Sequence, residues 1–226
     1  MSFVKDLQFT HFALRYKHQR RRAKYGAYGD TRHQETSANK PTNIDEDLGY
    51  AVFDGANNSV IKRAIACAEA LYSPDVIQTR YRENGGKGPF CVVDCDNKDP
   101  ESKPIFDLAE DEYILGPVRQ YLKATPVIVS VQVWFSPNNS NLASFNSQLF
   151  HFDREDYKQI KCFVPIHTID EQCGPMTIIP KSATARFVNT MWKKGKIPST
   201  KSRYDDSIVE KIIPNEEVAL CGHPGA

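Results

Sequence analysis

The segment PVIVSVQVWF, residues 126–135, consists mostly of β-branched and aromatic residues and predicts a β-strand. Similar short segments, separated by turn-forming residues, follow at 148–153, 160–166, 176–179 and from Val218 onward. Upstream, apolar residues recur at steps of three and four over 59–71 and 108–122 and predict two amphipathic helices. Because the helices precede the strands instead of alternating with them, we expect an α+β fold, a double-stranded β-helix of the jelly-roll or cupin type with flanking N-terminal helices.

The region before the first helix divides into a basic arm and the start of the folded domain. Residues 15–24, RYKHQRRRAK, carry six Lys and Arg in ten positions, and the stretch after them is rich in Gly, Thr, Ser and Asn. We therefore predict a weakly ordered N-terminal arm over 1–43 and one jelly-roll domain over 44–226. Within that domain, short apolar runs at 48–53 and 90–93 predict two further strands.

The composition narrows the class of protein. The 226 residues contain 29 Lys and Arg against 28 Asp and Glu, so no overall field draws the chain to nucleic acid or to an anionic membrane. No apolar run approaches the roughly 20 residues that cross a bilayer, and the N-terminus lacks the order of a signal peptide. The six cysteines form no CxxC pair, which argues against a zinc knuckle. We expect a soluble, cytoplasmic protein.

The residues that carry chemistry are His151 and Asp153, in the segment SQLFHFD at 147–153. On a strand, residues two apart project from the same face, so one imidazole nitrogen and one carboxylate oxygen can bind the same metal ion. These are two of the three ligands of the 2-His-1-carboxylate facial triad of non-haem iron oxygenases, which leaves coordination positions open for a cosubstrate and O2. Because His-x-Asp is short enough to arise by chance, its surroundings decide its meaning.

The surroundings of this motif resemble the phytanoyl-CoA dioxygenase-like Fe(II)/2-oxoglutarate-dependent oxygenases. In that family a His-x-Asp strand is followed by a lysine-containing strand, an acidic turn and a Gly-Pro-apolar-Pro segment. This chain has HFD at 151–153, KCFVPI at 161–166 and IDEQCGPMTIIPKS at 169–182, in the same order and at similar spacing. The segment GYAVF at 49–53 is also similar to the opening strand of the family.

The resemblance implies that His151 and Asp153 bind Fe(II) and are the catalytic residues, with 2-oxoglutarate as cosubstrate and O2 as oxidant. It also implies that Gln132 and Lys161 face the site and contact the cosubstrate, although each could be an ordinary strand residue. The carboxylate of Asp153 favours hydroxylation, because halogenating relatives have a small residue at that place. Residues 186–194 lie where the family places substrate-recognition loops, and we expect a solvated loop there. The expected activity is thus hydroxylation of a small molecule.

The chain departs from the family near its C-terminal end. The family's third ligand is a His on a late strand, followed about ten residues later by an Arg or Lys that pairs with the distal carboxylate of 2-oxoglutarate. Residues 217–226 resemble the strand and turn just before that His, so we expect both residues, and the last jelly-roll strands, beyond Ala226. A chain that ends there should hold iron weakly and turn over poorly. His223 and His167 are alternative ligands, but their positions fit a turn and a strand end better.

Two other functional classes remain open. One is a noncatalytic β-barrel binding module whose basic arm at 15–24 contacts nucleic acid or an acidic partner, which predicts salt-sensitive binding without a metal. The other is a cupin-type metalloenzyme that does not use 2-oxoglutarate, which needs more His near His151 than this chain has. A requirement for both Fe(II) and 2-oxoglutarate distinguishes the oxygenase from these alternatives.

Overall fold

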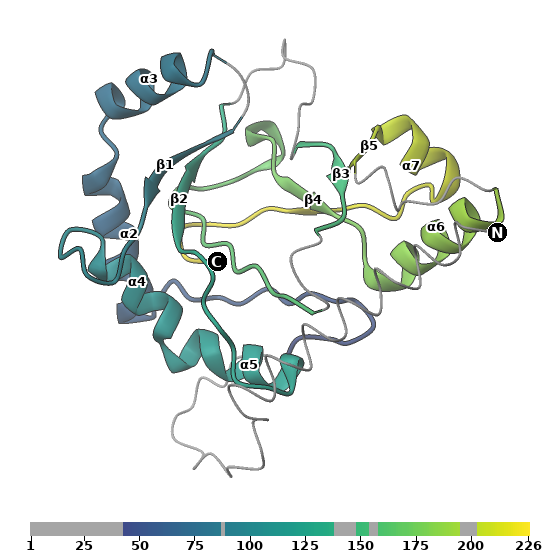
Figure 1. The fold of residues 1–226 in the computed structure, drawn as a ribbon, viewed down its shortest axis with the longest axis horizontal. Helices are drawn as coiled ribbons and strands as arrows, with labels where there is room; N and C mark the ends of the chain where they lie inside the picture. The colour runs from purple at the N-terminus through teal and green to yellow at the C-terminus, as the bar shows by residue number, and fades with distance from the viewer. Residues whose placement is uncertain (1–42, 87–88, 138–147, 154–157, 195–202) are drawn as a thin grey trace, which may run out of the picture.

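The computed structural model describes residues 43–86, 89–137, 148–153, 158–194 and 203–226 (Figure 1). Its elements are α-helices and short β-strands, and the strands form two-stranded antiparallel sheets. The chain is therefore an α+β protein, as predicted. The basic arm predicted over 1–43 lies outside these residues except for Asn43. No helix in the described ranges is both long and apolar enough to span a membrane.

Helix α2 (Ser59–Leu71) confirms the first predicted helix. Its N-cap is Asn58, whose side chain accepts hydrogen bonds from the amides of Val60 at 2.8 Å and Ile61 at 3.2 Å. The buried face of α2 packs against α4 (Lys103–Glu110), where Ile61 meets Leu108 in a common apolar cluster. The helical spacing of the apolar residues and the burial of one face therefore agree.

Helix α3 (Pro74–Glu83) was not predicted. Ser73 caps it by accepting a hydrogen bond from the amide of Val76 at 3.3 Å, and Pro74 occupies the first helical turn, where its missing amide is not needed. The Ser-Pro pair that follows α2 thus starts a second helix. None of the α3 residues is buried, so the apolar period that reveals other helices is weak here.

The single helix predicted over 108–122 is wrong, because the structure has two helices, α4 and α5 (Glu112–Leu122). Asp111 separates them. Its backbone is extended, with φ of −70° and ψ of 141°, and its side chain accepts a hydrogen bond from the amide of Tyr113 at 2.9 Å. Aspartate is a strong N-cap, so it can end one helix and start another although the apolar period continues through it.

Strand β1 (Phe90–Asp94) confirms the strand predicted at 90–93 and pairs antiparallel with β2 (Gln132–Phe135). The strand predicted over 126–135 is wrong in its first half, because regular pairing covers only the four residues opposite β1. An apolar, β-branched run can take strand geometry, but the hydrogen-bonded ladder is only as long as the partner strand.

Two more antiparallel pairs follow: β3 (Phe150–His151) with β5 (Arg203–Tyr204), and β4 (Met176–Ile178) with β6 (Val218–Leu220). The strands predicted near Met176 and from Val218 are confirmed, whereas β5 was not predicted. The strand predicted over 148–153 is wrong in its extent, because only Phe150 and His151 pair and Asp153 lies beyond the strand. The acidic segment before β4 forms the 3₁₀ turn η2 (Glu171–Cys173). Within the described part of the chain the three pairs do not join into a closed barrel, so the jelly-roll topology remains a prediction.

Two predicted strands, 48–53 and 160–166, are wrong because both segments are loops in the structure. The carbonyl of Leu48 accepts a hydrogen bond from the amide of Lys181 at 2.9 Å. Lys181 is the first residue of a helix, so this bond does not belong to a strand ladder. The second segment contributes Val164 and Ile166 to apolar clusters around α2. Val52 and Phe163 in these two runs are 57% and 59% exposed, so an apolar run predicted neither strand pairing nor full burial here.

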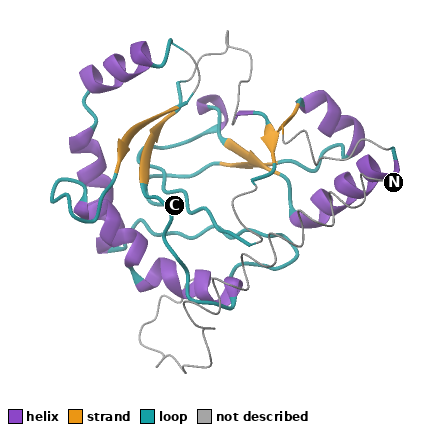
Figure 2. Cartoon of the chain, viewed as in Figure 1, coloured by secondary structure: helices purple, strands orange, loops and turns teal. Residues whose placement is uncertain are grey.

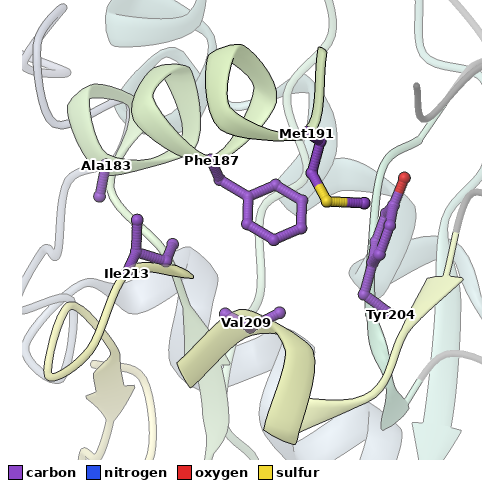
Figure 3. Packing of buried hydrophobic residues seen from close by; sticks show 6 residues of the cluster. All are labelled: Ala183, Phe187, Met191, Tyr204, Val209 and Ile213. Atoms are coloured by element: carbon purple, nitrogen blue, oxygen red, sulfur yellow. The ribbon is translucent and has the colours of Figure 1, made fainter. Parts of the chain in front are cut away.

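Helix α6 (Lys181–Lys193) replaces the loop predicted over 186–194, which was wrong, and contacts α7 (Asp206–Ile212). The two helices and β5 enclose the core of Figure 3, formed by Ala183, Phe187, Met191, Tyr204, Val209 and Ile213. The rings of Phe187 and Tyr204 meet edge to face with centroids 5.1 Å apart. Figure 2 shows α6 and α7 on one side of the strands and α2 to α4 on the other.

Candidate functional site

Strand β3 and the residues after it place alternate side chains on opposite faces. Phe150 and Phe152 pack against the core between α6 and α7, and the ring centroid of Phe152 lies 6.0 Å from that of Tyr204. Because side chains alternate along an extended backbone, His151 and Asp153 project from the other face. Both keep about a quarter of their side-chain surface exposed, at 26% and 28%. The aromatic residues therefore anchor the segment and orient the polar pair.

The structure brings His151 and Asp153 together, with Nε2 of the imidazole 3.5 Å from Oδ1 of the carboxylate. The other ring nitrogen, Nδ1, lies 2.8 Å from the backbone carbonyl oxygen of Leu149, to which it donates a hydrogen bond when it carries the proton. In the neutral ring Nε2 then carries a lone pair. Two acceptor atoms thus face each other, an arrangement that a cation or a proton between them stabilises.

The second oxygen of Asp153 has its own partner. Nζ of Lys161 lies 2.6 Å from Oδ2 of Asp153. This is a charge-assisted contact between groups that are partly exposed, at 52% for the lysine side chain and 28% for the aspartate. The pair joins the loop that contains Lys161 to the segment that contains the proposed ligands.

The imidazole of His151 and the carboxylate of Asp153 are the donor types that would hold a non-haem iron, which would supply redox chemistry if it bound there. Among the residues that the structure describes, no group of three or more His, Cys, Asp and Glu is arranged to hold a metal ion. The described residues therefore supply an imidazole and a carboxylate and add no third ligand.

Gln132, predicted to face the cosubstrate, lies on β2, apart from β3 in Figure 1. Its Nε2 donates to Oδ1 of Asp94 at 3.2 Å, and its Oε1 accepts from Nε1 of Trp134 at 2.9 Å. Both polar atoms of the amide are thus engaged within the β1–β2 pair. The role of Gln132 stays a prediction.

The two other candidate histidines have different partners. His223 lies in the turn after β6, with Nε2 3.8 Å from Oδ1 of Asp54. Nε2 of His167 contacts the hydroxyl of Tyr72, and the two rings meet edge to face with centroids 5.8 Å apart. Their positions agree with the interpretation of both as loop or packed histidines.

Two contacts of the site were not predicted from the sequence, namely the carbonyl of Leu149 at His151 and the ammonium of Lys161 at Asp153. The first contact involves a backbone carbonyl, which every residue has, so the residue type at 149 could not predict it. For the second, the sequence indicated only that Lys161 points toward the site. The spacing between Asp153 and Lys161 in the sequence does not by itself indicate a contact.

Comparisons with known proteins identify no family for this chain. No protein-family model matches it, and neither a curated protein nor a solved structure matches it. A function therefore has to be inferred from the residues themselves and from the resemblance in residues 151–182.

Proposed function

We propose that this chain is an Fe(II)- and 2-oxoglutarate-dependent dioxygenase of the jelly-roll type that hydroxylates a small molecule, with His151 and Asp153 as metal ligands. The observation that carries the proposal is the pair itself, whose Nε2 and Oδ1 atoms lie 3.5 Å apart. The resemblance of residues 151–182 to phytanoyl-CoA dioxygenase-like oxygenases supports the reaction class.

The pair offers two donor atoms to a cation, and Lys161 already balances the negative charge of Asp153. With its proton on Nδ1, the neutral imidazole of His151 directs a lone pair from Nε2 toward Oδ1 of Asp153. The hydrogen bond from Nδ1 to the carbonyl of Leu149 is the kind of contact that orients a metal-binding imidazole. Two protein ligands hold a metal weakly, and the described residues add no third.

The chain's own residues bind and orient the reactants. The metal, when bound, supplies the redox chemistry between 2-oxoglutarate and O2. Lys161 lies beside Asp153 and is therefore suitably placed to contact an anionic cosubstrate. Gln132 is retained as a cosubstrate contact on the resemblance alone.

The decisive experiment measures succinate formation from 2-oxoglutarate by this protein, together with its binding of Mn²⁺. His151→Ala and Asp153→Ala should each abolish turnover and weaken Mn²⁺ binding by more than about a hundredfold, because each removes a ligand, a larger change than the roughly 10–100-fold loss from removing a supporting contact. His167→Ala is the matched control, since this imidazole contacts Tyr72 instead.

Unchanged turnover in either ligand variant would contradict the assignment of the site. Salt-sensitive binding of nucleic acid that needs no metal and disappears on deletion of residues 15–24 would favour the noncatalytic binding module instead.

A further inference from the structure

A cavity lies between helices α4 and α5 and the chain that leads from α5 to β2. In Figure 1 the two helices follow one another, and the chain after α5 runs back toward β2. The cavity has a volume of about 390 Å³, which is within the range of pockets that take small molecules. Its lining residues are Phe106 and Glu110 of α4, Leu115 and Arg119 of α5, and Thr125, Pro126 and Ile128 of the following segment. None of them belongs to the segments of His151, Asp153 or Lys161, so the cavity is separate from the candidate metal site.

Most of the cavity wall is apolar. Phe106, Leu115, Pro126 and Ile128 are all partly buried. Phe106, Leu115 and Ile128 take no part in the three apolar clusters that the described residues form. Their apolar surface is therefore not used in packing the core, and it can be covered by the apolar part of a ligand.

The charged residues of the wall favour a cation over an anion. The side chain of Arg119 is only 16% exposed, and its Nη1 donates to Oε1 of Glu112 at 2.6 Å and also contacts Oε2. Glu112 thus balances the positive charge of Arg119. Glu110 is exposed at the end of α4, and no residue of the described ranges forms an ion pair with it. The three side chains together carry a formal charge of −1, which attracts a positive ligand.

We propose that this cavity binds a small organic cation that consists of an ammonium group on an apolar body. The apolar body lies against Phe106, Leu115 and Ile128, and the ammonium lies beside the carboxylate of Glu110. Burial of the apolar body supplies most of the affinity, since an exposed ion pair contributes little. Glu110 supplies the preference for positive charge. The proposal does not depend on the proposed function, because it uses no residue of that site.

The test is an NMR titration of the full chain, in which the backbone amide signals are followed as ligand is added. The probe is phenethylammonium, and its matched control is 3-phenylpropionate, which has a similar apolar body and a negative charge. We expect phenethylammonium to shift the amides of the lining residues in a saturable manner. The Kd of 3-phenylpropionate should be at least about threefold higher, because its carboxylate meets that of Glu110.

Two pairs of variants locate the two parts of the site. Glu110→Gln should weaken binding of phenethylammonium by about two- to fivefold and remove most of the preference over 3-phenylpropionate, whereas Glu101→Gln, an exposed carboxylate outside the cavity, should change neither. Ile128→Lys should weaken binding by more than about tenfold, because it removes apolar wall and adds a like charge. Val129→Lys is its control, since Val129 is 75% exposed and does not line the cavity.

Several results would overturn the proposal. One is the absence of saturable shifts at the lining residues with phenethylammonium up to about 10 mM, a concentration that detects even weak binding. Others are equal or tighter binding of 3-phenylpropionate, and a preference for phenethylammonium that survives Glu110→Gln. Equal losses in Ile128→Lys and Val129→Lys would also overturn it. If circular dichroism shows that Ile128→Lys is unfolded, Glu110→Gln decides alone, because it changes only an exposed side chain.

Discussion

The strand pairs β1–β2 and β3–β5 follow the same plan but present different outer faces. Each is a short antiparallel pair with one face on helices: β2 buries Val133 in a cluster with residues of α2, and β5 buries Tyr204 against α6 and α7. The outer face of β2 carries Gln132 and Trp134, whose side chains form a hydrogen bond with each other. The outer face of β3 carries His151. When helices cover one face of a strand pair, the opposite face stays accessible. The residue types on that accessible face decide whether the strand pair can bind a metal.

The two pairs also differ in what holds them. The β1–β2 ladder joins five residues to four, while β3 and β5 contribute two residues each. So short a ladder needs support from packing, and the rings of Phe152, Phe187 and Tyr204 supply it, with centroids 5.1 to 6.4 Å apart. The position of His151 and Asp153 should therefore depend on the aromatic core behind them.

The largest expected effect comes from removing that support. Phe187→Ala should lower the free energy of unfolding by about 3–5 kcal/mol, because Phe187 is buried and a cavity would remain. Urea denaturation measures this loss, and Mn²⁺ binding at His151 and Asp153 should weaken with it. Trp192→Ala, on the same helix but 42% exposed, is the control and should change stability by less than about 1 kcal/mol. Equal losses in the two variants would show that β3 does not depend on this core.

The core behind β1–β2 contains a thiol, which makes that region sensitive to alkali. Burial, with smaller contributions from Cys67 and Asp94, raises the pKa of the Cys95 thiol from 9.0 to about 11. Between these values the unfolded chain releases a proton that the folded protein keeps, so the free energy of unfolding should fall as pH rises from 9 to 11. The contribution is fully present below pH 9 and amounts to at most roughly 3 kcal/mol.

Cys95→Ala isolates this effect. Its free energy of unfolding, measured by urea denaturation at several pH values, should decline less steeply over this range than that of the wild type. Parallel declines would show that the thiol titrates alike in the folded and unfolded chain.

A smaller effect is expected at the start of α2, which covers the β1–β2 side. Asn58→Ala should cost about 1 kcal/mol, because the side chain satisfies the amides of Val60 and Ile61. Asn58→Ser retains a capping oxygen and should keep most of that stability. A thermal melt of both variants tests the difference, which would vanish if water replaced the cap equally well.

The smallest effect is expected on the outer face of β2. Trp134 is 54% exposed, so Trp134→Ala should change the free energy of unfolding by no more than about 0.5 kcal/mol and leave Mn²⁺ binding unchanged. Urea denaturation and Mn²⁺ titration measure the two quantities. Weaker Mn²⁺ binding in this variant would mean that the two strand pairs cooperate in one site.

The elements that could be predicted are those whose pattern is local. Helix α2 shows a clear apolar period, and β1, β4 and β6 are short apolar runs with β-forming residues. The failures occurred where a local pattern has two outcomes. The apolar run at 48–53 is a loop in which Leu48 and Val52 are exposed, and the period over 108–122 continues through Asp111 although that residue caps a new helix.

For the candidate site, the order of residues along the chain was sufficient to predict that His151 and Asp153 share a face, because alternation on an extended backbone is a local geometric rule. The contacts of Lys161 with Asp153 and of Leu149 with His151 depend on how a loop and a backbone carbonyl are placed in space. Such placement results from the packing of distant segments, here Val164 and Ile166 against the α2 side, and no pattern along one segment encodes it.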